Sequence, residues 1–154
     1  MFEFLKKEES GIAAPIGGTC IPLGEVPDDA FASGKMGTGF AVTSAGDTVV
    51  APVDGTIVMI PETRHAFGIE TKSSEEVLVH IGLNTVRMLG KGFMNLKSQG
   101  EAVKAGEAVI RFDREIVEEA GKDLTVIVTF PSGKVRMHEL TCYGNSVSAG
   151  EILK

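Results

Sequence analysis

The sequence predicts an all-β fold: an antiparallel β-sandwich or barrel with internal duplication and one or two short helices. Short β-rich runs recur along the chain, Gly, Pro, Asp and Ser separate them, and two pairs of segments repeat. Several short strands at this spacing are typical of sandwiches and barrels rather than of alternating strand–helix units. The 154 residues suffice to bury a core, and we expect a single domain over residues 11–154.

Six segments carry the composition of strands between turn signals. They are Asp47–Ala51, Gly55–Ile60, Ala66–Glu70, Glu76–Ile81, Ala108–Phe112 and Leu124–Phe130. One helix is expected over Asp113–Ala120, because Asp113 is a favourable N-cap and Gly121 a favourable stop. The stretches 24–39 and 89–100 are expected to be irregular loops.

Two pairs of segments suggest duplication. Ala14–Leu23 and Ala51–Ile60 share Ala, Pro, Gly and Thr in register, and Gly100–Glu107 and Gly144–Glu151 share Gly, Val and Ala-Gly-Glu. Each unit reads as a turn followed by a strand. Common turn chemistry explains one such pair easily and two less easily, so we favour two copies of one β motif.

Composition excludes several classes of protein. The chain carries 15 Lys and Arg against 21 Asp and Glu, a formal charge of −6, which disfavours nucleic acid as the main partner. No apolar run approaches the ~20 residues that span a bilayer. Cys20 and Cys142 lack a Cys-x-x-Cys spacing, so we expect packed free thiols and a cytoplasmic location. Residues 1–10 fit either a flexible terminus or an amphipathic segment with peripheral contact at the inner face of the membrane.

Two of the three histidines flank a polar turn. If Lys72 and Ser73 are its tip, hairpin pairing places His65 directly opposite His80, and the imidazoles touch. A slip of one residue would place them on opposite faces. Along the second strand, the alternation puts His80 on one face with Leu78. The other face, with the core, is expected to take Val77, Val79 and Ile81.

Two facing imidazoles have a definite chemistry. Each lowers the pKa of the other, so one nitrogen stays neutral and can attack phosphorus, bind a metal or act as a base. We expect Thr63 to orient the ring of His65 through a side-chain hydrogen bond. Gly82, which has no side chain, is expected to leave backbone amides open for a phosphate.

Six segments of the chain resemble those of a known family: Thr63–Glu70, Leu78–Val86, Gly90–Phe93, Ala51–Thr56, Val26–Phe31 and Gly37–Ala41. They are similar to the enzyme IIA (EIIA) domain of the glucose family of the bacterial phosphoenolpyruvate-dependent sugar phosphotransferase system. The resemblance implies a duplicated antiparallel β-sandwich. It also implies a phosphoryl-transfer component in which His80 accepts phosphate from the phosphohistidine of the carrier HPr and passes it to a cysteine of an EIIB domain of a membrane sugar permease. His65 would then support the phosphoryl group, and Thr63 would hold His65.

The resemblance further implies a shallow docking surface for proteins, no resident cofactor and no metal, with regulatory target proteins as in some relatives. Its binding residues would be Phe31, Met36, Leu78, Gly82, Asn84 and Val86. An apolar rim excludes water and strengthens charge interactions at the phosphorus. The family commonly has Asp at the position of Asn84, and Arg87 adds a positive charge, so both bear on partner choice. Asp28, Asp29 and Glu70 are expected to keep the surroundings acidic.

Two other classes fit less well. A biotin- or lipoyl-carrier domain needs a hairpin-tip Lys flanked by Met or an acidic residue, which Lys35-Met36 matches poorly, and it leaves the histidines unexplained. A zinc peptidase needs a further carboxylate and usually a His-x-His pair, so His65 and His80 make an incomplete site, open at most to adventitious zinc. The third histidine, His138, is expected to be an exposed strand residue.

Overall fold

The computed structural model describes residues 11–131 and 140–154 of the chain. The predictions for residues 1–10 and for His138 therefore lie outside the described residues. The strands are β1 (Gly18–Pro22), β2 (Thr38–Ser44), β3 (Thr48–Val50), β4 (Gly55–Met59), β5 (Ala66–Glu70), β6 (Glu76–Ile81), β7 (Phe93–Asn95), β8 (Ala102–Val103), β9 (Ala108–Phe112), β10 (Thr125–Phe130) and β11 (Ser146–Val147). The helices are α2 (Asp29–Ala32) and α3 (Arg114–Glu119), with 3-10 turns η1 (Leu23–Glu25) and η2 (Thr85–Met88).

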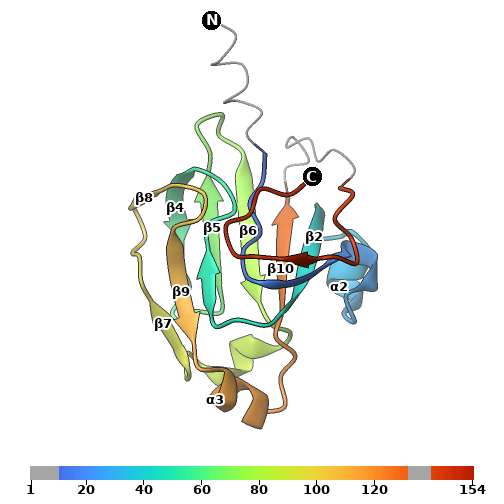
Figure 1. The fold of residues 1–154 in the computed structure, drawn as a ribbon. Coiled ribbons are helices and arrows are strands. Elements are labelled where there is room, and N and C mark those ends of the chain that lie inside the picture. Colours follow the sequence, from blue (N-terminus) through green and yellow to red (C-terminus); the bar gives the residue numbers. More distant parts are fainter. Residues whose placement is uncertain (1–10, 132–139) are drawn as a thin grey trace, which may run out of the picture.

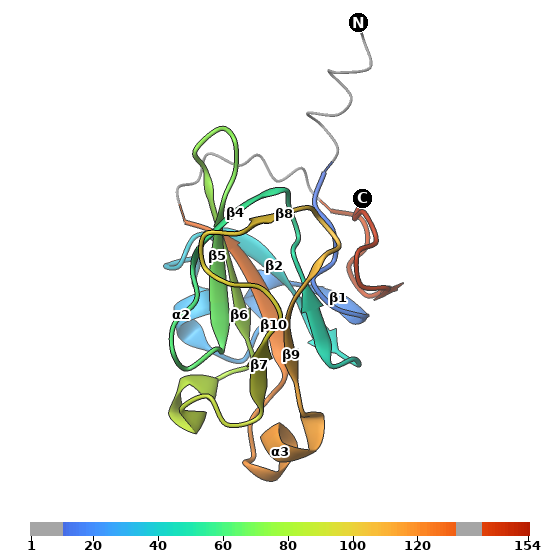
Figure 2. The same ribbon diagram turned by 90° about the vertical axis from the view of Figure 1, so that its left-hand side faces the viewer.

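The strands form two antiparallel sheets, as the sequence predicted. The larger sheet has eight strands in the order β11-β1-β2-β10-β6-β5-β4-β8, and the smaller has three in the order β3-β9-β7. Figures 1 and 2 show β7 and β9 lying over one side of the larger sheet, while α2 sits beside β2. Within the described residues, no helix has the length and apolar character needed to cross a membrane.

The strand and helix predictions hold wherever a segment has a clear pattern. All six expected strands form, and β5, β6 and β9 have the expected bounds. Helix α3 begins after Asp113, whose carboxylate accepts a hydrogen bond from the Ile116 N–H at 3.2 Å. The expectation of irregular loops was wrong in part, because 24–39 contains α2 and the start of β2, and 89–100 contains β7.

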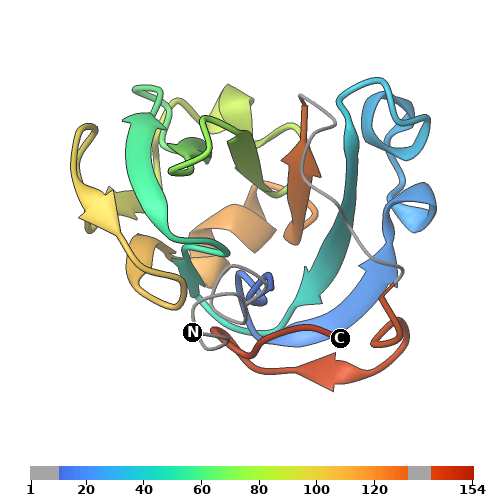
Figure 3. The same cartoon turned by 90° about the horizontal axis from the view of Figure 1, so that it is seen from above.

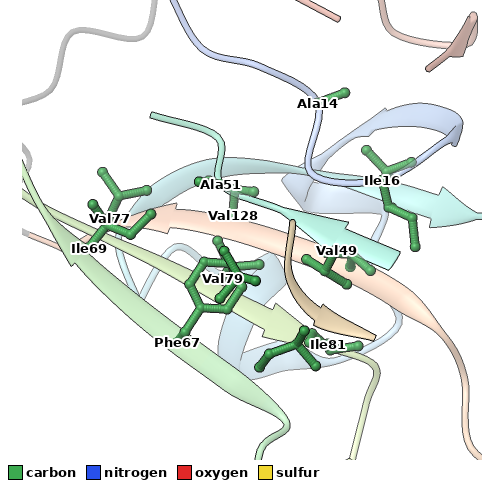
Figure 4. Packing of buried hydrophobic residues seen from close by; sticks show 14 of the residues in the cluster. Ala14, Ile16, Val49, Ala51, Phe67, Ile69, Val77, Val79, Ile81 and Val128 are labelled. Atoms are coloured by element: carbon green, nitrogen blue, oxygen red, sulfur yellow. The ribbon is translucent and has the colours of Figure 1, made fainter. Parts of the chain in front are cut away.

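The main core lies between the two sheets. Val77, Val79 and Ile81 point into it from β6 and are fully buried, which confirms the expected alternation. Phe67 and Ile69 come from the neighbouring β5, and Figure 4 shows Phe67 and Val79 side by side in this packing. Residues at even positions of β6 are thereby turned to the opposite face of the sheet.

A second, smaller cluster covers that opposite face. It consists of Val26, Phe31, Ala41, Leu83 and Ile127, with Ile21 and Leu23 packed against it. Phe31 is the buried residue of α2, a helix that the Asp28 carboxylate caps by accepting a hydrogen bond from the Ala30 N–H at 2.9 Å. This cluster fixes α2 to the sheet beside β10 and β6.

The repeats occupy equivalent places. Strand β1 pairs with β11, and the corresponding segments β4 and β8 pair in the same way at the other end of the sheet. The Ala14 N–H donates to the Glu151 carbonyl at 2.8 Å, and the Ala51 N–H donates to the Glu107 carbonyl at 2.8 Å. The predicted duplication is therefore confirmed, and the copy that contains β4 and β8 is nested along the chain between the two halves of the copy that contains β1 and β11.

Candidate functional site

His80 lies near the middle of the outer face of the larger sheet. Its position in β6 is directly opposite Ile127 of β10 on one side and Ala66 of β5 on the other. Phe31 of α2 leans on its ring, with centroids 5.2 Å apart. Strand pairing and the α2 cluster thus hold the imidazole in place while it remains half-buried at the surface.

The predicted hairpin register was wrong by one residue. Ala66, and not His65, lies opposite His80, because the turn between β5 and β6 is longer than the assumed two-residue tip. The Thr71 N–H donates to the Glu75 carbonyl at 2.9 Å, and Ser74 has a positive φ of 65°. Such a backbone conformation adds a residue to the turn in a way that the side-chain pattern does not reveal.

The two imidazoles nevertheless meet. His65 lies in the bend that precedes β5, directly after Arg64, whose φ is 56°. Because His65 is not part of the strand, the alternation of faces along β5 does not apply to it, and its side chain can lie on the same side of the sheet as His80 in spite of the register shift. The rings of His65 and His80 are edge to face, with centroids 4.9 Å apart and an interplanar angle of 79°.

Hydrogen bonds define which nitrogen of His80 is available. Nδ1 is 2.8 Å from the carbonyl oxygen of Gly82, and a carbonyl only accepts, so Nδ1 carries the proton and donates it. In the neutral ring, Nε2 then keeps its lone pair and is the nucleophilic nitrogen. The geometry fixes both the orientation and the tautomer of His80.

A second hydrogen bond holds His65. The Thr63 hydroxyl oxygen is 2.7 Å from Nδ1 of His65, which is the contact expected from the sequence. Nδ1 is engaged on the side of Thr63, so Nε2 is the nitrogen left for a ligand. Because a hydroxyl both donates and accepts, it accommodates His65 in either tautomer.

Both histidines are shifted toward the neutral form. Burial, and second the charge of His80, lower the pKa of His65 from 6.5 to about 4. Burial also lowers the pKa of His80, against the opposing effects of the Gly82 hydrogen bond and the Asp28 carboxylate. Near neutral pH the pair thus presents two uncharged rings, and each retains a free nitrogen.

Gly82 contributes differently from the prediction. Its N–H donates to the Thr125 carbonyl at 2.8 Å and the Leu83 N–H donates to the Asp123 carbonyl at 2.9 Å, so these amides are not open to a phosphate. Its φ is 79°, and a Cβ here would lie 2.6 Å from Cγ2 of Thr85 and 2.7 Å from the Asp123 carbonyl oxygen. Gly82 is needed for the tight turn that brings its carbonyl to His80.

Of the predicted rim residues, Phe31 and Leu78 lie beside His80, whereas Met36 and Val86 lie on other segments. Leu78 shares the outer face of β6 with His80 and is half-buried, and Phe31 contacts the His80 ring. Met36 follows α2 and is 41% exposed, and Val86 of η2 is 46% exposed. Asn84 is exposed and precedes η2 with a φ of 61°, a conformation that Asn tolerates well.

The acidic side chain that acts on His80 comes from the residue that caps α2 rather than from β5. Asp28 acts on His80 through its charge, and it also caps the helix that carries Phe31. Glu70, in contrast, pairs with Glu76 at the far end of the hairpin, so its expected place beside the histidines was wrong. The capping role of Asp28 and the carbonyl role of Gly82 were both missed from the sequence, although Asp before a short Ala-Phe-Ala segment is a recognisable N-cap signal.

The described residues contain no cluster of side chains arranged to bind a metal ion. Among the residues in 11–131 and 140–154, no group of three or more His, Cys, Asp and Glu side chains is placed to hold an ion. One surface hollow is lined by residues of β7, β9 and α3, and another by residues beside β2 and β10. Neither of these hollows includes His65 or His80.

Comparison with known proteins identifies the family of the chain. The model of the family described as phosphoenolpyruvate-dependent sugar phosphotransferase system, EIIA 1, matches residues 10–135. The chain therefore belongs to this family of phosphotransferase-system EIIA components.

Relatives of known name support the assignment. A glucose-specific EIIA component of Bacillus cereus is 46% identical over 124 residues, covering 80% of this chain and 75% of that protein. The glucose permease IIA of Mycoplasma capricolum has a similar solved structure, with a TM-score of 0.81 and 35% identity over 92% of each chain. A mannose-specific EIIBCA component of Corynebacterium glutamicum is 43% identical over 116 residues, which cover 75% of this chain and 17% of that longer protein.

Proposed function

We propose that this protein is a cytoplasmic phosphocarrier that takes a phosphoryl group from phosphorylated HPr onto Nε2 of His80 and delivers it to a cysteine of an EIIB domain. The observation that carries the proposal is the hydrogen bond from Nδ1 of His80 to the Gly82 carbonyl, beside the second imidazole. This hydrogen bond leaves Nε2 of His80 as the nucleophilic nitrogen, next to the ring of His65. The names of the relatives favour a hexose such as glucose or mannose as the sugar served.

The acceptor step needs no further base. The Nε2 lone pair of His80 attacks the phosphorus, and the bond from phosphorus to the nitrogen of the donor phosphohistidine breaks with its electrons returning to the donor ring. The His80 ring gains the phosphoryl group on Nε2 and keeps its Nδ1 proton on the Gly82 carbonyl. Because burial keeps His80 uncharged near neutral pH, no proton has to leave Nε2 first.

His65 stabilises the transferring group. If the Thr63 hydroxyl donates to Nδ1, the His65 proton lies on Nε2 and points toward the neighbouring ring, where a phosphoryl oxygen would stand. A hydrogen bond there stabilises the charge that develops on the oxygens in the transition state. Phe31 on the other side of His80 limits access of water to the phosphorus.

Delivery reverses this sequence. A thiolate of the EIIB cysteine attacks the phosphorus, and the Nε2–phosphorus bond breaks to regenerate neutral His80. The apolar rim of Phe31, Met36, Leu78 and Val86 supplies the contact area for each partner in turn. Relatives in which EIIA is fused with EIIB in one EIIBCA chain favour an EIIB domain as acceptor.

Two variants test the proposal. His80→Ala removes the nucleophile, so labelling from phosphorylated HPr is expected to disappear, while the control His138→Ala is expected to label normally. His65→Gln keeps the nucleophile and is expected to accept phosphate but to donate it poorly to an EIIB domain. Persistent labelling of His80→Ala on His65 or His138 would overturn the assignment. Transfer rates to EIIB domains of glucose and mannose permeases then identify the partner.

A further inference from the structure

The two cysteines of the chain lie against each other, at the place where the C-terminal segment passes β1. Cys20 Sγ and Cys142 Sγ are 3.1 Å apart although the residues are 122 positions apart in the sequence. Cys20 is fully buried in the main core, and Cys142 is half-buried at its edge. Figure 3 shows the two segments, β1 in blue and the C-terminal residues in red, side by side at one margin of the larger sheet.

Backbone hydrogen bonds hold the two thiols together. The Cys20 N–H donates to the Asn145 carbonyl at 3.0 Å, and the Cys20 carbonyl accepts from the Gly144 N–H at 2.7 Å. The Asn145 N–H donates to the Cys142 carbonyl at 2.9 Å, which closes a tight turn. The turn presents Cys142 to Cys20, so the proximity of the sulfurs comes from the fold rather than from a side-chain rotamer alone.

We propose that Cys20 and Cys142 form a site of reversible oxidative modification, at which a peroxide converts the two thiols into an intrachain disulfide. The phosphoryl site does not use these groups, because Cys20 faces the main core and His80 faces the opposite side of the sheet. In the cytosol of mesophiles such disulfides are usually transient, which suits a modification made under oxidative stress and later reversed by thiols.

The burial of the two thiols sets the order of events. Burial, together with the neighbouring Cys142, raises the pKa of the Cys20 thiol to about 12, so Cys20 is the poorer first nucleophile. The thiolate of Cys142 attacks one peroxide oxygen, the O–O bond breaks, and a sulfenic acid and water form. The Cys20 sulfur then displaces the sulfenic oxygen, which leaves with the Cys20 proton as a second water. The sum is two thiols and one peroxide giving one disulfide and two waters.

The expected consequence is a firmer C-terminal segment. Leu140, Val147 and Leu153 of this segment are buried in the core, but β11 pairs through only two residues. A covalent link closes a loop of more than a hundred residues, and the reduced entropy of the unfolded chain stabilises the folded one. We expect the midpoint of thermal unfolding, Tm, to rise by about 5–10 °C.

Peroxide treatment of the full chain tests this proposal. The protein is treated with equimolar hydrogen peroxide, its remaining free thiols are alkylated, and it is then digested for peptide mapping. The expected result is a peptide pair linked between Cys20 and Cys142, an intact mass lower by two hydrogens and a raised Tm that returns with a dithiol reductant. Cys142→Ser removes the more exposed thiol and is expected to show no oxidative rise in Tm. The proposal would be overturned by any of three results: two free thiols after treatment, a sulfinic acid on Cys142, or a disulfide between two chains. Peptide mapping of the unaltered protein gives this answer even if Cys142→Ser does not fold.

Discussion

Replacing Thr63 by Val tests how the hydroxyl positions His65. Valine keeps the shape of the side chain but removes the hydroxyl oxygen, which lies 2.7 Å from Nδ1 of His65. A neutral hydrogen bond contributes about 0.5–1.5 kcal/mol, which corresponds to roughly 2- to 10-fold in a rate constant. We therefore expect Thr63→Val to slow transfer from the phosphorylated protein to EIIB by roughly 2- to 10-fold.

The readout separates positioning from folding. Rapid-quench measurements give the rate of transfer, and ¹⁵N NMR of the imidazoles reports the tautomer of His65. Thr63→Ser keeps the hydroxyl and is the matched control, expected to transfer at close to the normal rate. If Thr63→Val and Thr63→Ser transfer equally fast, or if the ¹⁵N shifts of His65 are unchanged in Thr63→Val, the hydroxyl does not orient His65 and the reasoning fails.

Three further predictions address charge and packing. Folding lowers the pKa of His65 from 6.5 to about 4, so between pH 4 and pH 6.5 the unfolded chain binds more protons than the folded one. The free energy of unfolding, measured by denaturant titration, is therefore expected to fall as the pH drops from about 6.5 toward 4, and to fall less in His65→Gln. Phe31→Ala removes a buried ring, which costs about 3–5 kcal/mol in unfolding experiments, and exposes His80, whose NMR-titrated pKa is expected to rise toward its ordinary value. Arg87→Glu introduces a negative charge near Asn84 and is expected to lower the KM for a basic HPr at low salt. Lys72→Glu makes the same change of charge at the far end of the hairpin and is expected to leave the KM unchanged, so equal effects of the two substitutions would refute local steering.

The parts of the fold with a repeating pattern were predictable from the sequence. In β6 the residues alternate without exception between the two faces of the sheet. Val77, Val79 and Ile81 pack into the core, and Leu78 and His80 lie on the opposite face. The repeated Ala-Gly-Glu turns were also predictable from the sequence. Both turns make the same backbone hydrogen bonds, so they require the same residues. A four-residue helix such as α2 is too short to show a helical period, which explains why it was missed.

The site itself was predictable in its members but not in its contacts. The residue composition of Thr71–Glu75 does not fix the length of the turn, and Ser74 at positive φ shifted the register by one residue. The bend at His65 compensated for this shift. Likewise, the Gly82 N–H donates a hydrogen bond to the carbonyl of Thr125, which is more than forty residues away in the sequence. A local sequence pattern does not predict such a long-range contact.

The central claim is that the phosphoryl group resides on Nε2 of His80. The most direct test is ³¹P and ¹H–¹⁵N NMR of the protein phosphorylated by HPr, with ¹⁵N-labelled histidine to identify the bonded nitrogen. We expect a phosphorus–nitrogen coupling to Nε2 of His80, while Nδ1 of the same ring keeps its proton and donates it to the Gly82 carbonyl. Coupling to Nδ1 of His80, or to either nitrogen of His65, would contradict the account.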